Sequence, residues 1–175
     1  MSTDKGVLSV FFHEDTDYAR IIGQLLGRTP TYTPARFKGF SFCLQELDEM
    51  PRKIHDVLAT KWPPNFRSYV LVRLPKHEAF GRIIDVTPKE MQILDAWYLT
   101  DLHWHNRVKV GTHRFANGER RSVSAHVLGE RQSCGPIIPS RDQEQGLPFL
   151  NQYGLSTVLA CQLREHMLKV LAPMQ

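Results

Sequence analysis

Two histidines in the middle of the chain have a spacing seen in some metal sites. His103 and His105 are separated by one residue, so on a regular strand both imidazole rings lie on the same side. That side would also carry Arg107 and Lys109, whose positive charges oppose a bound cation, and the strand supplies no carboxylate ligand. We therefore expect surface or partly packed histidines, and the sequence predicts neither a metal site nor a cofactor.

The cysteines do not indicate nucleophilic chemistry. Cys43, Cys134 and Cys161 are odd in number and scattered, which favours a reducing compartment over a disulfide framework. Cys134 is the one cysteine in a stretch rich in glycine and proline. A nucleophilic thiolate needs a nearby base, and the sequence alone places no histidine beside Cys134.

Residues 81–110 contain the clearest succession of elements, a strand, a capped helix and the start of a second strand. Thr87 and Glu90 form a capping box, with Pro88 at the first helical position. The apolar face of this helix consists of side chains at helical spacing: Met91, Leu94, Trp97 and Tyr98. The helix should end within three residues of Tyr98, and a strand should begin around His105.

Alternating apolar residues and turn signals predict the remaining elements. We expect further strands at 7–12, 37–44, 67–74 and 121–128, with a turn at 75–78 leading back to Gly81. A helix should end at Gly27, a short helix should precede Pro63, and an amphipathic helix is expected at 154–172. Residues 129–153 read as a long loop.

Asn117 and Gly118 lie between two predicted strands and are typical of a two-residue hairpin turn. Such a turn would form an apolar face from three pairs: Val108 with Val127, Val110 with Ala125, and Thr112 with Val123. The opposite face would hold polar side chains and be exposed to water: His105, Arg107, Lys109 and His126.

Composition favours one cytoplasmic domain. The chain has 175 residues, 42% of them hydrophobic, which is enough for a core of its own. No apolar stretch is long enough to span a bilayer, and the first residues lack the layout of a signal peptide. The net charge of +4 is spread along the chain without a nucleic-acid reader motif, so binding to membranes or nucleic acids is not expected.

Residues 81–110 resemble the gamma-glutamylcyclotransferase-like superfamily, in particular its avirulence-induced-gene type. In that family a glycine opens a strand ending in V-T/S, the next helix carries L-D-x-F/W-E, and Y-x-R and alternating valines follow. The matching residues are Gly81, Val86, Thr87, Leu94, Asp95, Ala96, Trp97, Arg107, Val108 and Val110. The LGR-x-P stretch at 26–30 also matches, and the resemblance covers roughly residues 7–128.

The resemblance implies an α+β fold, a small mixed β-barrel with helices packed on it. The whole chain, 1–175, would then be a single gamma-glutamylcyclotransferase-like domain. Its core would span about 7–128, followed by the 129–153 loop and the 154–172 helix, which would cover the open side of the barrel.

Two departures from the family pattern affect the implied active site. Tyr98 stands where the family keeps its catalytic glutamate. The family's Y-G-T/S-L loop, whose backbone N–H groups bind the substrate carboxylate, corresponds here to about 12–15 and contains no glycine. Glu14 and Asp15 make that loop acidic, and they also suit the start of a helix. In addition, His105 replaces the tyrosine of Y-x-R.

The family's chemistry is an intramolecular aminolysis that releases 5-oxoproline from gamma-glutamyl amines, with a carboxylate to accept and return a proton. One hypothesis is an active enzyme in which Asp101 or Glu14 replaces the missing glutamate and Tyr98 orients the substrate. The substrate-binding residues implied by the resemblance are Phe11, Phe12, His13 and Trp97.

The other hypothesis is a pseudoenzyme that binds a small molecule, such as a gamma-glutamyl amine, or a protein partner. Tyr98 would then fill the former pocket. The residues alone favour this second hypothesis slightly, because both the glycine loop and the glutamate are missing.

Overall fold

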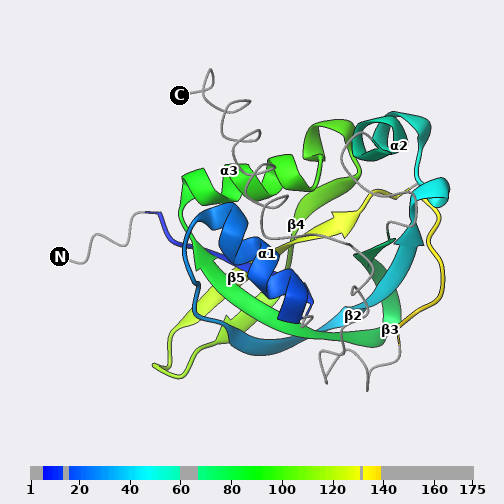
Figure 1. Cartoon of the computed structure of the whole chain (residues 1–175). Helices are drawn as coiled ribbons and strands as arrows, with labels where there is room; N and C mark the ends of the chain where they lie inside the picture. Colours follow the sequence, from blue (N-terminus) through cyan, green and yellow to red (C-terminus); the bar gives the residue numbers. More distant parts are fainter. Residues whose placement is uncertain (1–5, 14–15, 60–66, 131, 139–175) are drawn as a thin grey trace.

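A computed structural model describes residues 6–13, 16–59, 67–130 and 132–138 (Figure 1). The elements are, in order, β1 (Leu8–His13), α1 (Thr16–Leu26), β2 (Thr33–Glu46), the 3-10 helix η1 (Leu47–Glu49), α2 (Arg52–Ala59), β3 (Arg67–Val86), α3 (Pro88–Trp97), the 3-10 helix η2 (Thr100–Leu102), β4 (His105–Arg114) and β5 (Arg120–Leu128). The predicted α+β class is confirmed. Glu14, Asp15 and the predicted helix at 154–172 lie outside the described residues.

The five strands form one mixed sheet in the order β2-β3-β1-β5-β4. β1 pairs antiparallel with β3 and parallel with β5, and the long strand β3 also touches β5 through the pair Leu71 and Val127. The sheet curls, but β2 and β4 are not joined by a ladder of hydrogen bonds, so the sheet is not closed into the expected small barrel. Phe37 of β2 instead packs against Gly111 of β4, where an added Cβ would lie 2.9 Å from the ring.

Helix α1 ends and helix α3 begins at the residues that the sequence predicted. Gly27 (φ 72°) ends α1, and the N–H of Arg28 donates to the Gly23 carbonyl across the last turn. The Thr87 hydroxyl accepts from the Glu90 N–H, and the Glu90 carboxylate accepts from the Thr87 N–H, so the capping box is confirmed. Figure 1 shows α1 lying across the sheet with α3 above it.

The core fills the inside of the curled sheet and the space beneath the helices. Phe11 meets Phe37 edge-on at 4.8 Å and stacks on Phe42 at 5.8 Å. The side chains of β2 from Phe40 to Gln45 are buried on both faces of the strand. On one face Phe42 packs against Phe11, and the side chains of the opposite face are also shielded from water. Within the described residues, no helix has the length and apolar character needed to cross a membrane.

The predicted turn at 75–78 is a bulge within a continuous strand. Lys38 pairs with Glu78 and Phe40 pairs with Arg73, so only Gly39 lies opposite residues 74–77. Gly39 has φ 86°, a conformation that favours glycine, and Pro75 has no N–H to donate to a ladder. The strand therefore passes through the predicted turn and continues to Val86.

The hairpin between β4 and β5 also differs from the prediction. Phe115 donates its N–H to the Glu119 carbonyl, so the loop contains three residues, with Gly118 at φ 84°. A further register shift lies between Lys109 and Gly111. Val108 therefore pairs with Ala125 rather than with Val127. The predicted apolar face of β5 is confirmed by its buried side chains: Val123, Ala125 and Val127.

Candidate functional site

Polar and aromatic side chains gather at one end of the sheet. β1 and β5 are parallel and both end there, while β4 begins there and β3 enters beside β5. We call the side chains that contact one another there, beneath α3 and η2, the sheet-end cluster: Gln45, Tyr98, Trp104, His105 and His126. The cluster includes the position at which the family resemblance would place a catalytic glutamate.

Tyr98 is buried in this cluster, directly after the last residue of α3. The helix ends here because Leu99 takes a left-handed conformation with φ 48°. The Tyr98 side chain lies with its ring stacked on His126, at a centroid distance of 4.3 Å and an angle of 16°. It also meets His105 edge-on at 4.9 Å. The aromatic ring thus occupies the space between two buried histidines.

Asp95 supplies the carboxylate closest to this stack. His126 donates from Nε2 to Asp95 Oδ1 at 2.8 Å, and Arg107 lies 3.4 Å from Asp95 Oδ2. Burial lowers the pKa of His126, while the hydrogen bond and charge of Asp95 oppose that shift. His126 is therefore neutral at pH 7, and both oxygens of Asp95 are already engaged.

The two histidines were expected on a water-exposed face, which is wrong. Their relative exposure is 1% for His105 and 5% for His126, because α3 and η2 cover this end of the sheet. Burial lowers the pKa of His105 well below its ordinary value, and neighbouring His126 adds to the effect. The Tyr98 backbone opposes this shift, and within the described residues neither ring nitrogen of His105 makes a well-aligned hydrogen bond.

Gln45 is a fully buried amide that the sequence interpretation missed. Its Oε1 accepts from Trp104 Nε1 at 2.9 Å, and its Nε2 donates to the Ser133 carbonyl at 3.0 Å. Gln132 in turn donates to the carbonyls of His103 and Trp104. The available signal was a glutamine at the end of an otherwise apolar strand. A polar group there has to find partners when buried.

The residues expected to bind substrate are all buried in the core. Phe12 packs against Tyr32 at 5.7 Å, and His13 lies 4.5 Å from the ring of Tyr69. Burial lowers the pKa of His13 to about 3, with a smaller contribution from Arg82. Phe11 and Trp97 are likewise buried. A role of these residues in substrate binding stays a prediction.

The two carboxylates proposed as replacements for the glutamate are not both described. Asp101 is exposed on η2, and in the described part of the chain no hydrogen bond or ion pair links it to the sheet-end cluster. Glu14 lies outside the described residues. The structure therefore does not link Asp101 to Tyr98, and the role of Glu14 stays a prediction.

The histidine pair considered for metal binding does not form a shared site. His103 precedes the strand in a left-handed conformation (φ 57°) and contacts Asn106 Oδ1 at 3.1 Å, whereas His105 points into the core. Among the described residues no group of three metal-ligating side chains is positioned around a common point. The regular strand assumed in the sequence interpretation begins only at His105.

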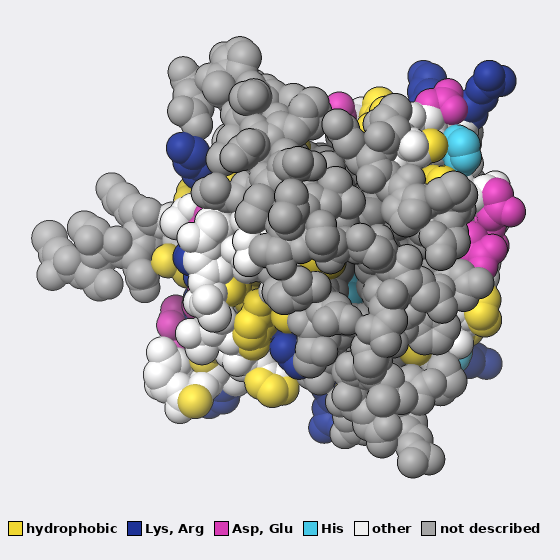
Figure 2. All heavy atoms as spheres, in the orientation of Figure 1, with side chains coloured by type: hydrophobic (Ala, Val, Ile, Leu, Met, Phe, Trp, Pro, Cys, Tyr) yellow, Lys and Arg dark blue, Asp and Glu magenta, His cyan; other side chains and the backbone are white. Residues whose placement is uncertain are grey.

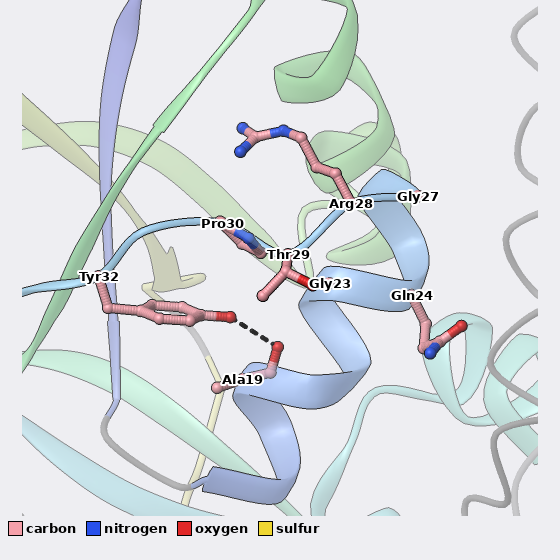
Figure 3. Close-up of a pocket in the computed structure, with 8 residues that line it drawn as sticks. All are labelled: Ala19, Gly23, Gln24, Gly27, Arg28, Thr29, Pro30 and Tyr32. Atoms are coloured by element: carbon pink, nitrogen blue, oxygen red, sulfur yellow. Dashed lines mark hydrogen bonds between the residues drawn. The ribbon is translucent and has the colours of Figure 1, made fainter.

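A separate depression of about 540 Å³ lies beside the C-terminal end of α1 (Figure 3). It is lined by Ala19, Gly23, Gln24, Gly27, Arg28, Thr29, Pro30 and Tyr32. The Tyr32 hydroxyl donates to the Ala19 carbonyl, and Arg28 points away toward Glu90, which it binds with two hydrogen bonds. These polar groups are already paired, so the described residues that line the depression offer no free acid or base for chemistry.

Charge on the visible surface is dispersed. Figure 2 shows Lys and Arg side chains at separate points around the described part of this face rather than in one patch. Ion pairs connect several elements, including Arg121 with Asp85 at 3.0 Å. This pattern indicates a solvated surface.

No protein-family model and no curated protein matches the chain. A solved structure of a gamma-glutamyl cyclotransferase superposes with a TM-score of 0.53 and 11% identity, covering 95% of this chain and 99% of that chain. The chain has the gamma-glutamyl cyclotransferase fold.

Two further structures share this gamma-glutamyl cyclotransferase fold. An uncharacterized protein from Homo sapiens superposes with a TM-score of 0.53 at 11% identity, over 91% of this chain and 88% of that chain. A protein from Arabidopsis thaliana, solved in solution, superposes with a TM-score of 0.52 at 19% identity, over 100% of this chain and 98% of that chain. At such identities the likeness establishes the fold, while the chemistry has to be argued from the residues.

Proposed function

We propose that this protein is a cytoplasmic pseudoenzyme, a gamma-glutamylcyclotransferase-like domain that binds a small molecule or a protein partner without performing the standard cyclisation. The observation that supports this proposal most directly is the packing of Tyr98. Where the family resemblance places a catalytic carboxylate, an aromatic ring lies stacked on His126 at 4.3 Å. A filled position is what a binding module predicts, whereas an enzyme requires an open polar one.

The chemistry of the reaction gives the second argument. Cyclisation needs a group that accepts the amine proton at neutral pH and returns it to the leaving group. A tyrosine with an ordinary pKa near 10 is a poor base under these conditions. Among the described residues, Asp95 is a carboxylate that contacts the cluster, but its oxygens face His126 and Arg107 at 2.8 and 3.4 Å. It serves to hold α3 against β4 and β5.

The proposal is tested by measuring 5-oxoproline release from a panel of gamma-glutamyl amines with the wild type and Tyr98→Glu side by side. We expect no release by the wild type, and saturable binding of at least one panel member or of a protein partner. Release by Tyr98→Glu alone would support the proposal, because it shows a surviving pocket that lacks only its base. The matched control is Tyr98→Gln, because glutamine has nearly the same shape as glutamate but cannot act as a base.

Turnover by the wild type would contradict the proposal and point to a relocated carboxylate. Asp101→Asn and Glu14→Gln would then identify it, because each variant removes one charge with little change in size. Circular dichroism of every variant distinguishes a lost fold from a lost activity.

A further inference from the structure

Residues 132–138 form a strap along the free edge of β2. Gly135 donates its N–H to the Leu44 carbonyl at 2.6 Å, and Leu44 donates back to the Pro136 carbonyl at 3.2 Å. Ile138 donates to the Phe42 carbonyl at 2.9 Å. The strap therefore extends the sheet beyond β2, on the side away from β3.

Two thiols meet where the strap lies against β2. Cys43 lies within β2 and is 2% exposed, whereas Cys134 lies in the strap and is half-buried. Both are free thiols, and the two side chains are near enough to interact electrostatically. The backbone bonds of Gly135 and Ile138 lie on either side of the bridge between Cys43 and Ile137, so the two segments are already aligned.

We propose that Cys43 and Cys134 form a reversible disulfide that locks the strap onto β2. The backbone pairing carries the inference, because the hydrogen bonds that join Leu44 to Gly135 and Pro136 bring the preceding residues of the two segments, Cys43 and Cys134, close together. This inference concerns the regulation of the fold and does not depend on whether the protein is an enzyme or a binding module.

The oxidant is a low-molecular-weight disulfide such as oxidised glutathione. The Cys134 thiolate attacks one sulfur of that disulfide, releases one thiol and leaves a mixed disulfide on Cys134. Cys43 then loses its proton and attacks the Cys134 sulfur, which releases the second thiol. Two protein thiols are oxidised, and one small disulfide is reduced to two thiols.

The environments of the two cysteines assign these roles. Cys134 is the more exposed thiol and meets the oxidant first. Burial raises the pKa of the Cys43 thiol to about 12, and the charge and hydrogen bond of Cys134 contribute to that rise. In the mixed disulfide Cys134 carries no charge, so it no longer raises the pKa of the Cys43 thiol when Cys43 reacts.

The lock acts on the sheet-end cluster through Gln45. The Gln45 amide donates to Ser133 and Gln132 in the strap and accepts from Trp104, whose ring meets His105 edge-on at 4.5 Å. A strap that is fixed by a disulfide keeps these hydrogen bonds formed. In the reduced protein, opening of the strap would leave the Gln45 amide and the Trp104 N–H without these partners.

The experiment treats the reduced full-length protein with an excess of oxidised glutathione. We expect the loss of two hydrogen atoms by intact mass and a cross-linked peptide pair that contains Cys43 and Cys134. Amide hydrogen exchange at Gly135 and Ile138, which donate to β2, should slow about tenfold or more. Exchange at Phe115, which donates to Glu119 in the distant hairpin, should be unchanged and serves as the internal control.

Variants separate the disulfide from other oxidation products. Cys134→Ser should abolish both the cross-link and the slower exchange, and Cys43→Val, which preserves an apolar core position, should do the same if the first variant does not fold. Cys161→Ser should retain both effects. Glutathione remaining on Cys134, a cross-link to Cys161 instead, or unchanged exchange at Gly135 and Ile138 in the cross-linked protein would each overturn the proposal.

Discussion

At the end of α3 the Tyr98 ring lies between two buried histidines, stacked on His126 at 4.3 Å and edge-on to His105 at 4.9 Å. Such packing gives the side chain a structural role that a glutamate could not fill, because a carboxylate buried against neutral imidazoles loses its hydration. The Tyr98 side chain therefore stabilises this end of the sheet, and in the proposed pseudoenzyme it stands where the family resemblance places the base.

Replacing the ring should be costly. We expect Tyr98→Ala to lower the free energy of unfolding by about 3 kcal/mol, since the removed ring leaves a cavity between His105 and His126. Tyr98→Phe keeps the ring and should cost about 1 kcal/mol or less. Urea denaturation measures both. A loss below about 1 kcal/mol for Tyr98→Ala would show that the ring is not packed as described.

At the scale of elements, α1 and α3 are joined through one arginine. Arg28 follows the end of α1 and binds both carboxylate oxygens of Glu90, at 2.6 and 3.0 Å, and the Asp85 carbonyl at 2.7 Å. Glu90 is also the capping-box residue of α3, so a single carboxylate caps one helix and fixes the end of another. The hydrogen bond from Arg28 lowers the pKa of Glu90.

We expect Arg28→Ala to lower the free energy of unfolding by about 1 kcal/mol, a modest value because the Arg28 side chain is 40% exposed. Arg28→Lys should recover little of this loss, because an ammonium group cannot bind both carboxylate oxygens in the same plane. A double-mutant cycle with Glu90→Gln measures the coupling. Additive effects of the two changes would contradict a direct interaction.

The elements that the sequence predicted well are those with local signals. The capping box at Thr87 and the glycine at position 27 each specify a helix end through neighbouring residues alone. The hairpin register was missed because the Gly118 loop has three residues and a second shift follows at Lys109. The shift after Lys109 interrupts the alternation of β4 between Val110 and Gly111, and the sequence pattern does not show where such a bulge occurs.

At the scale of the whole molecule, His105 and His126 are buried because α3 and η2 cover the part of the sheet in which they lie. Periodicity along β4 and β5 separates two faces but does not say which part of a face a helix will cover. His126 is buried and Arg107 is exposed, although they are paired neighbours on adjacent strands. The association of Asp95 with His126, across 31 residues, likewise requires the tertiary fold.

The buried histidines make the stability of the whole protein depend on pH. Burial lowers the pKa of His13 to about 3 and lowers those of His105 and His126 below the ordinary value of 6.5. The unfolded chain therefore binds more protons below pH 6.5, so the stabilisation is fully present above that pH. It is lost progressively as the pH falls from about 6.5 toward 3.

Urea denaturation between pH 5 and 7.5 should show this loss, with a limiting slope of about 1.4 kcal/mol per pH unit for each histidine. Even pH 5 lies above the ordinary pKa values of Asp and Glu, so carboxylates bind few protons in this range. The slope therefore comes mainly from the histidines. His105→Phe should reduce the slope by the contribution of one histidine, about 1.4 kcal/mol per pH unit. A free energy of unfolding that does not change between pH 5 and 7 would exclude neutral buried histidines.

The most direct measurement of the central proposal is 5-oxoproline release from gamma-glutamyl amines by the wild type, with enzyme in excess over substrate so that a single turnover is detectable. We predict no release above the reaction without protein, because the packed ring of Tyr98 lies where the family resemblance places the catalytic carboxylate. Stoichiometric formation of 5-oxoproline would contradict the account and show that another group of this protein supplies the base.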